Sequence, residues 1–516
     1  MLVGHEHQHV ARIHTIALLT GFSNIQLSRL GRELQMKFDE YAELDAVGIA
    51  EAIKKGDFSA REITDTAIEV SRQMNPELNA LVMTNYDNAR AFVDNGLPDS
   101  PISGSPFYLK DVNQFSHDMP TTFSCRFFED AKPRPDSELV SRWRRAGLVI
   151  LGKTNTPEFA EDFVCEPTFR GVTLNPWNTA VTTGGSSGGA GAAVASGMVP
   201  LAHATDLGGS IRIPSACCGV FGLKPTTGLN SVGPYYLEIS NGFNSDHVLT
   251  RTVRDSAAAL DCSAGPLPGS RYQVRPRVDS YLECLDRAVP KLRIGVSKST
   301  PFGLETDGSQ AASVDRVSAA LDDMGHELHE YRYPADLGLG GWMEDLWMVD
   351  IVYEIDKRIA EIGREPEDHE LESLTRYLRG HVAGLSAMDL YRARQNAHEA
   401  SMKMMNSMAN LDLVLTPALG SNPIPVGAMD SRTENFDMNT WGETGHAFAP
   451  FAYICNVTGQ PAASLPIQLN PGEHPCAVQL AGHSCEDHLI LQVAAQLEQH
   501  FGWNQYRPPL WVGNLE

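Results

Sequence analysis

The chain has 516 residues, of which 42% are hydrophobic and 20% are charged, and its formal net charge is −23. This composition is typical of a soluble globular protein, and the acidic balance argues against a nucleic-acid partner, because phosphate binding needs a clustered basic face. No apolar run reaches the length of about 18 residues that a membrane-spanning helix needs, so no membrane partner is expected.

Nine cysteines are spread thinly over the chain. An odd number without a paired framework favours reduced thiols and a cytoplasmic protein over disulfides. The adjacent Cys217 and Cys218 lack the C-x-x-C spacing of metal or redox sites, so we interpret both as small core residues and expect no metal site.

Residues 1–35 are predicted to be an N-terminal extension that is poorly ordered. The apolar residues 16–19 follow no Lys/Arg-rich start and precede no A-x-A cleavage site, so a signal peptide is not expected. One domain is predicted to begin near Met36 and to run to residue 516.

The first elements of this domain are predicted to be helices within residues 45–82. Ser59 and Glu62 have the spacing of a capping box at the start of the second helix. Asn75-Pro76 is expected to end that helix, because proline cannot donate the next backbone hydrogen bond. A strand over 78–83 is expected to follow.

Residues 107–109 are apolar and predict a buried strand that delivers Lys110 at its end. A lysine in that position is partly desolvated, which favours its neutral form. Local sequence leaves two other interpretations open, in which Lys110 reaches solvent or pairs with Asp111. A helix and then a strand are predicted over 139–151.

Residues 184–225 are rich in glycine and serine and poor in charge, with serine-bearing glycine turns at 184–189 and 208–210. Glycine permits sharp turns whose consecutive N–H groups converge on one point and can hold a developing negative charge. A nucleophilic serine beside an oxyanion hole needs this arrangement. The simpler alternative is that these serines are only turn residues.

Residues 185–189 also satisfy G-x-S-x-G, the nucleophile elbow of α/β-hydrolase esterases, with Ser187 at its centre. An elbow follows a buried strand, whereas residues 179–183 are polar. An elbow also needs a downstream acid and histidine, and no particular histidine stands out. The pattern therefore gives only weak support to an esterase.

After residue 225 helices and strands alternate, which predicts an α/β fold with a sheet covered by helices on both faces. Residues 338–410 carry Trp, Met, Leu and Tyr at helical spacing and predict a helical insertion whose side chains form pocket walls or simply pack together. The expected helices are 253–264, 311–324 and 489–501, and the expected strands are 292–296, 327–333 and 411–417.

The glycine-rich stretch resembles the signature of the amidase signature family, serine hydrolases with a Ser–cis-Ser–Lys triad. Residues 152–159 are similar to the GKTN-x-PEF segment of this family, and residues 456–466 to its late N-x-x-G-x-P-x-x-S-x-P motif. The resemblance covers approximately residues 40–505, and the core of the signature lies approximately at residues 105–260. It implies one α/β/α domain with a mixed central sheet.

The resemblance places the nucleophile at Ser210, the bridging serine at Ser186 and the base at Lys110. Serine is a poor nucleophile until a base takes its proton, and a buried neutral lysine can do so through the bridging hydroxyl. The resulting acyl-enzyme on Ser210 is then hydrolysed by water, so no cofactor is expected. The backbone N–H groups of Leu207, Gly208 and Gly209 are the expected oxyanion hole. Supporting roles fall on Ser187, Thr205, Asp206 and Arg212.

Residues 202–206 and the paired cysteines look like the branch that includes bacterial hydrolases of cyclic oligoamides. Leucine at position 207 departs from the usual threonine or glycine and is expected to narrow the pocket. The resemblance implies a C–N hydrolase, a homodimer by family expectation, that takes a hydrophobic, aryl or cyclic small-molecule amide.

A second function remains open, the glutaminase subunit of a tRNA-dependent amidotransferase. That subunit carries an acidic residue shortly before the late motif, where it holds the amino group of glutamine. Residues 447–451 of this chain are apolar and would leave an ammonium group unpaired, which favours a free-standing amidase.

Overall fold

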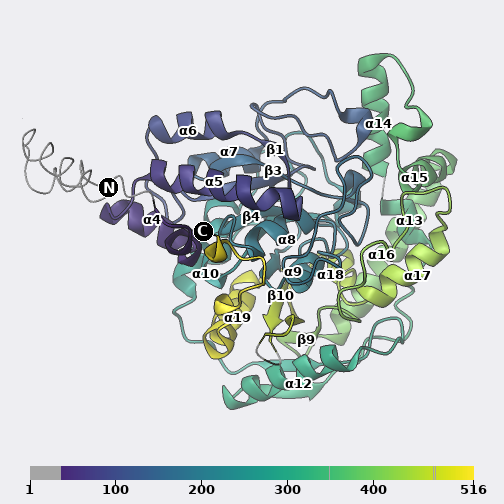
Figure 1. Ribbon diagram of the computed structural model, residues 1–516. Helices are drawn as coiled ribbons and strands as arrows, with labels where there is room; N and C mark the ends of the chain where they lie inside the picture. Colours follow the sequence, from purple (N-terminus) through teal and green to yellow (C-terminus); the bar gives the residue numbers. More distant parts are fainter. Residues whose placement is uncertain (1–35, 348, 469, 471, 516) are drawn as a thin grey trace, which may run out of the picture.

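The computed structural model describes residues 36–347, 349–468, 470 and 472–515 (Figure 1). The predicted N-terminal extension at 1–35 lies outside the described residues. Among the helices that are described, none is both long and apolar enough to span a bilayer.

The described strands form one mixed sheet in the order β1-β3-β2-β4-β6-β5-β10-β11-β9-β7-β8. Strand β2 pairs in parallel with both β3 and β4, whereas β4 and β6 are antiparallel. The strands are β1 Leu81–Thr84, β2 Pro106–Lys110, β3 Val149–Thr154, β4 Leu201–Asp206, β5 Phe221–Lys224, β6 Ser245–Thr250, β7 Arg293–Val296, β8 Glu327–Glu330, β9 Leu413–Pro417, β10 Ala462–Ile467 and β11 Cys476–Gly482.

Helices connect most of these strands, which confirms the predicted α/β class. The helices of the first half are α3 Phe38–Glu43, α4 Ala46–Lys55, α5 Ala60–Leu78, α6 Tyr86–Asp94, α7 Glu138–Arg145, α8 Gly188–Ala195, α9 Arg212–Cys218 and α10 Val253–Ser263. The helices of the second half are α11 Tyr281–Cys284, α12 Gly308–Asp323, α13 Trp342–Trp347, α14 Val349–Ile362, α15 Ser373–Gly384, α16 Ala387–Ser407, α17 Met438–Phe448, α18 Ile454–Thr458 and α19 Asp487–Phe501.

Helices cover both faces of the sheet near β2. Successive side chains of a strand point to opposite faces, so Phe107 and Tyr108 mark the two sides. Tyr108 belongs to a buried apolar cluster with residues of α5 and α8. Phe107 belongs to another cluster with residues of α7 and α10. The end of β2, which carries Lys110, is therefore enclosed from both sides.

The start of α5 agrees with the prediction and its end does not. Ser59 accepts a hydrogen bond from the Glu62 N–H, and the Glu62 carboxylate accepts one from the Ser59 N–H, which completes the capping box. The prediction that Asn75-Pro76 ends the helix is wrong, because α5 continues to Leu78. Proline in the last turn removes one hydrogen-bond donor only, and Asn79 closes the helix in a left-handed conformation with its N–H on the Asn75 carbonyl. The next strand therefore begins only at Leu81.

Helices α13–α16 occupy the range predicted to be a helical insertion, and Figure 1 shows them grouped at one side of the molecule with α17. The helices and strands predicted beyond residue 225 also form, with ends shifted by at most three residues.

Candidate active site

Three chain segments converge at one end of the central strands. Lys110 is the last residue of β2, and Thr205 lies near the end of the parallel neighbour β4. Ser186 precedes α8, and Ser210 precedes α9. Parallel strands bring their carboxyl ends to the same edge of the sheet, which is the usual position of ligand sites in α/β folds.

The Lys110 side chain is fully buried and points at Ser186. Its Nζ donates hydrogen bonds to Ser186 Oγ at 2.6 Å and to Thr205 Oγ1 at 2.8 Å. Burial lowers the pKa of Lys110 to about 7, because the charged ammonium loses its hydration. A large fraction of this lysine is therefore the neutral amine near neutral pH.

The two other interpretations of Lys110 are wrong. Its side chain has no exposed surface, so it does not reach solvent. Asp111 pairs with a different buried lysine, Lys153, whose Nζ lies 3.3 Å from its carboxylate. Adjacent residues of a strand point to opposite faces, so Asp111 cannot follow Lys110 into the site.

The backbone of Lys110 is held by His203 of β4. The Lys110 N–H donates to His203 Nδ1 at 3.2 Å, and His203 Nε2 lies 3.0 Å from the Asp246 carboxylate. An accepting Nδ1 requires the proton to be on Nε2, so this imidazole is neutral and donates to Asp246. Burial lowers the pKa of His203, in agreement with the neutral form. Sequence reasoning missed this positioning residue.

Ser186 and Ser210 are neighbours whose hydroxyls are not joined directly. The Gly185–Ser186 peptide bond is cis. The Ser187 N–H donates to the Ser210 carbonyl at 3.3 Å, whereas no hydrogen bond between the two hydroxyls is found in the described part of the chain. Ser210 is 8% exposed and lines a cavity, so its hydroxyl is accessible to a ligand.

Ser187 does not have the surroundings of an elbow nucleophile. It is fully buried, and its Oγ contacts the backbone N and O of Thr205, each at 3.3 Å. An elbow nucleophile stands exposed above the sheet. The Ser187 hydroxyl instead fixes the end of β4.

The turn after β4 is organised by the Asp206 carboxylate. Asp206 accepts hydrogen bonds from the N–H groups of Gly209 at 2.9 Å and Ile211 at 3.1 Å. The expectation that Gly209 contributes to the oxyanion hole is therefore corrected, because its N–H is directed to Asp206. Leu207 and Gly208 remain as candidate donors. Gly209 adopts φ +127°, and a Cβ there would lie 2.6 Å from Ala452 Cβ, so the turn requires glycine.

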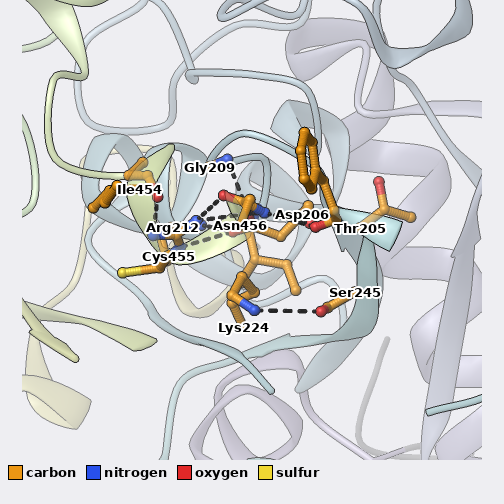
Figure 2. Close-up of polar contacts among 12 residues, drawn as sticks. Thr205, Asp206, Gly209, Arg212, Lys224, Ser245, Ile454, Cys455 and Asn456 are labelled. Carbon is orange, nitrogen blue, oxygen red and sulfur yellow. Dashed lines mark hydrogen bonds and ion pairs between the residues drawn. The ribbon is translucent and has the colours of Figure 1, made fainter. Parts of the chain in front are cut away.

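Arg212 holds Asp206 in a bidentate ion pair (Figure 2). Arg212 Nε and Nη2 donate to the two carboxylate oxygens at 2.9 and 2.8 Å, and the guanidinium also donates to Asn456 and Gln479. Burial alone would raise the pKa of Asp206, but the charge and hydrogen bonds of Arg212 lower it to about 2. Asn456, the first residue of the late motif, also donates to the Asp206 backbone carbonyl at 2.8 Å.

Replacing Arg212 with methionine is expected to lower the free energy of unfolding by about 3–5 kcal/mol, because it leaves the Asp206 carboxylate buried without its partner. Urea unfolding followed by circular dichroism measures this change. Arg332→Met is the matched control, since Arg332 is 81% exposed and its ion pair with Glu330 is expected to contribute at most about 1 kcal/mol. A similar small effect for Arg212→Met would contradict the structural role assigned to this pair.

Two cavities lie at this site, and Ala160 and Leu207 line both of them. One is lined by Ser186, Thr205 and Asp350, and the other by Ser210 and Gly208. Helices α13 and α14 contribute to the walls, as predicted for the helical region. Sequence reasoning missed the polar wall residues Glu161, Asp350 and Tyr453. The only signal for Glu161 was its place two residues after the end of the GKTN-x-PEF segment.

Comparisons with known proteins find relatives that match most of this chain. The family model described as Amidase matches residues 62–491. The 6-aminohexanoate-cyclic-dimer hydrolase of Paenarthrobacter ureafaciens is 33% identical over 485 residues, which cover 90% of this chain and 96% of the relative. A solved structure of 6-aminohexanoate cyclic dimer hydrolase superposes with a TM-score of 0.86 at 32% identity, covering 91% of this chain and 99% of that chain. A glutamyl-tRNA(Gln) amidotransferase subunit of Synechococcus sp. (strain CC9311) is 32% identical over 498 residues, which cover 88% of this chain and 97% of the relative.

Proposed function

This chain belongs to the Amidase family and is an amide hydrolase, and from that premise we propose that it cleaves a non-peptide amide through an acyl-enzyme on Ser210. The observation that carries the proposal is the contact between the Lys110 amine and Ser186 Oγ at 2.6 Å. A neutral amine in that position is a general base, and the serine hydroxyl that it contacts can pass on a proton.

The reaction begins when Lys110 takes the proton of Ser186 and Ser186 takes the proton of Ser210. The Ser210 oxygen attacks the amide carbon, and the oxyanion that forms accepts hydrogen bonds from the Leu207 and Gly208 N–H groups. Ser186 then gives its proton to the departing nitrogen and regains one from Lys110, and the C–N bond breaks. In the second half of the reaction Ser186 takes a proton from water and passes its own to Lys110, and the water oxygen attacks the acyl carbon. Ser186 then gives its proton to the Ser210 oxygen and regains one from Lys110, so the ester bond breaks, the carboxylic acid leaves and Ser210 is restored.

The ion pair of Asp206 and Arg212 keeps the oxyanion turn in place during these steps. Stabilisation of a transition-state charge is effective only when the donors are already oriented before the charge develops. Asp206 accepts hydrogen bonds from the Gly209 and Ile211 N–H groups, and these bonds hold the turn that carries the Leu207 and Gly208 peptide groups. The turn therefore contributes through its rigidity.

The proposed substrate is a hydrophobic, aryl or cyclic amide. The cavity at Ser210 is lined largely by apolar side chains, among them Ile213, Phe243 and Ala449. Of residues 447–451 only Ala449 lines this cavity, and the stretch has no carboxylate at the place where the amidotransferase subunit is expected to hold the amino group of glutamine. A free-standing amidase is therefore favoured over the glutaminase of an amidotransferase, although both kinds of relative match the chain.

We also propose that the enzyme works in the cytoplasm. All nine cysteines of the sequence are described residues, and each is a free thiol. Free thiols persist in a reducing compartment. A homodimeric assembly is proposed from the family resemblance alone.

The test is labelling with a fluorophosphonate serine probe, followed by mass mapping of the adduct and by assays with an amide panel and with glutamine. The expected result is an adduct on Ser210, hydrolysis of hydrophobic amides and no reaction with glutamine. An adduct on Ser187 would favour the elbow mechanism. Hydrolysis of glutamine that appears on addition of partner subunits would favour the amidotransferase function.

A further inference from the structure

A carboxylate with an accessible oxygen lines the cavity that contains the bridging serine. Asp350, in the first turn of α14, is half-buried and shares this cavity with Ser186. Its Oδ1 accepts hydrogen bonds from the Ser240 N–H at 3.0 Å and from the Ser240 hydroxyl at 3.4 Å. Its Oδ2 has no hydrogen-bond partner among the described residues and is not one of their fully enclosed unpaired atoms. A ligand in the cavity can therefore reach Oδ2.

The second feature of this cavity is the charge of Asp350. No Arg, Lys or His of the described residues lines the cavity or forms an ion pair with Asp350. Burial raises the pKa of Asp350 to about 6, so the group is mostly a carboxylate at neutral pH. Glu354, one turn further along α14, is by contrast paired with Lys357 Nζ at 2.7 Å and with Arg134 Nη1 at 3.5 Å. An unpaired carboxylate away from bulk water is costly, which favours a ligand that brings a cation.

Asn113 presents a second acceptor to the same cavity. The Asp246 carboxylate accepts from His203 and, at 2.5 Å, from Asn244 Nδ2, so the amide oxygen of Asn244 points away from it. That oxygen accepts from Asn113 Nδ2 at 3.4 Å. The remaining amide atom, Asn113 Oδ1, has no hydrogen-bond partner among the described residues and is not fully enclosed. The cavity therefore offers two accessible acceptors, one of which is charged.

Aromatic rings form a further part of the wall. Phe123, Phe159 and Tyr236 line the cavity together with the two acceptors. The negative face of an aromatic ring attracts an alkylammonium, and the ammonium has three N–H donors for the acceptors. The cavity encloses about 440 Å³, its open mouth included, which is within the usual size of small-molecule sites. The chemistry of this wall therefore matches an alkyl chain that ends in an ammonium group.

The position of Asp350 assigns it to one part of the substrate. Ser186, which gives its proton to the departing nitrogen in the proposed mechanism, lines the cavity with Asp350. Ser210, which holds the acyl group, lines the other cavity, whose wall is largely apolar. The departing amine therefore occupies the cavity with Asp350, and an apolar acyl group occupies the cavity with Ser210.

We propose that Asp350 binds a protonated amino group carried by the departing amine, so that the preferred substrates are diamines acylated on one nitrogen by an apolar acyl group. The ammonium donates to Asp350 Oδ2 and to Asn113 Oδ1. Hydrolysis consumes one water and releases a carboxylic acid and the diamine. The inference rests on the proposed function, since it takes Ser210 as the nucleophile and Ser186 as the acid. Asp350 and Asn113 determine specificity and take no part in bond cleavage.

The experiment compares three amides of equal length. N-pentylhexanamide is neutral, N-(ω-aminobutyl)hexanamide carries an ammonium in place of the terminal methyl group of the amine, and N-pentyl-ω-aminopentanamide carries it in place of the terminal methyl group of the acyl chain. The wild-type kcat/KM is expected to be at least about tenfold higher for the aminobutyl amide than for the neutral amide, because only its cation pairs with Asp350. The aminopentanamide is expected to be a poorer substrate than the neutral amide, because its ammonium enters a largely apolar cavity. Liquid chromatography with mass spectrometry measures the released amines.

Asp350→Asn is expected to lower the ratio of kcat/KM for the aminobutyl amide to that for the neutral amide by at least about tenfold. An asparagine oxygen can still accept from Ser240, so the variant removes the charge and keeps this contact. Asp356→Asn is the matched control, since it removes the same charge from a side chain of α14 that is 61% exposed, and its ratio is expected to equal that of the wild type. Circular dichroism checks that each variant is folded, and Asp350→Ser keeps the test decisive if Asp350→Asn does not fold.

The outcomes distinguish failure of this inference from failure of the proposed function. A wild-type ratio near or below one, or a ratio that Asp350→Asn leaves unchanged, would overturn the inference and leave the amidase function intact. Hydrolysis of p-nitroanilides but of none of the three amides would have the same meaning. A wild-type preference for the aminopentanamide would also overturn the inference, because that result places the cation in the acyl part. An enzyme that hydrolyses no amide would overturn the proposed function and the inference with it.

Discussion

Replacing Ser210 with alanine is expected to lower kcat/KM for amide hydrolysis by about 10⁴-fold or more. Without its oxygen no acyl-enzyme forms, and only binding and oxyanion stabilisation remain to accelerate the reaction. The same variant is expected to lose all labelling by a fluorophosphonate probe. Steady-state kinetics with a p-nitroanilide and mass mapping of the labelled protein measure the two effects.

The matched control for this variant is Ser196→Ala. Ser196 is a buried serine at the end of α8 whose hydroxyl donates to the Ala192 carbonyl of its own helix at 2.7 Å. Its replacement is expected to leave kcat/KM within about twofold of the wild type, because this hydroxyl donates only to backbone carbonyl groups of its own helix. Full activity in Ser210→Ala together with inactivity in Ser187→Ala would reverse the assignment of the nucleophile.

Replacing Lys110 with methionine is expected to lower kcat/KM by about 10²–10⁴-fold, the usual contribution of a general base. Lys110→Arg is expected to be as inactive as Lys110→Met, because a guanidinium keeps a positive charge but cannot accept a proton. The comparison of the two variants separates a lysine that acts as a base from one that only supplies charge. An active Lys110→Arg enzyme would be incompatible with the proton relay through Ser186.

The pH dependence of the wild type follows from the lowered pKa of Lys110. Below about pH 7 the side chain is mostly an ammonium, which cannot accept a proton, and above it the free amine predominates. We therefore expect kcat/KM to rise about tenfold per pH unit on the acid side of this pKa and to level off above it. The residual kcat/KM of Lys110→Met is expected not to rise with pH in this range. If kcat/KM of the variant rose with the same midpoint pH as the wild type, another group would be responsible for the pH dependence.

Many of the helices, strands and candidate site residues could be predicted from the sequence, because the patterns that indicate them involve only neighbouring residues. The capping box of Ser59 and Glu62, the apolar run before Lys110 and the spacing of glycines around Ser210 each depend on a few neighbouring residues. The alternation of helices and strands after residue 225 is likewise a property of short windows, which is why the element ends differ only slightly from those predicted. The family motifs then indicated the nucleophile, the bridging serine and the base as candidates.

Local signals were insufficient where two energetically similar choices compete. The end of α5 was misjudged because a single missing donor at Pro76 costs less than the packing and capping that carry the helix on to Leu78. The role of Gly209 was misjudged because its N–H can face either a substrate or a neighbouring carboxylate. Asp206 decides that choice through a side chain whose position depends on Arg212 and Asn456.

The class of fold, the order of its elements and the candidate residues of the triad could all be predicted from the amino-acid sequence. The contact of Lys110 with Ser186, 76 positions away, and the pairing of Asp111 with Lys153 became clear only from the packed chain. The same holds for the position of Asp350 in the cavity with Ser186. The physical reason is that backbone preferences depend on residues that are neighbours in the sequence. Burial, pKa shifts and unpaired polar atoms depend instead on contacts between distant segments, which form only when the core packs.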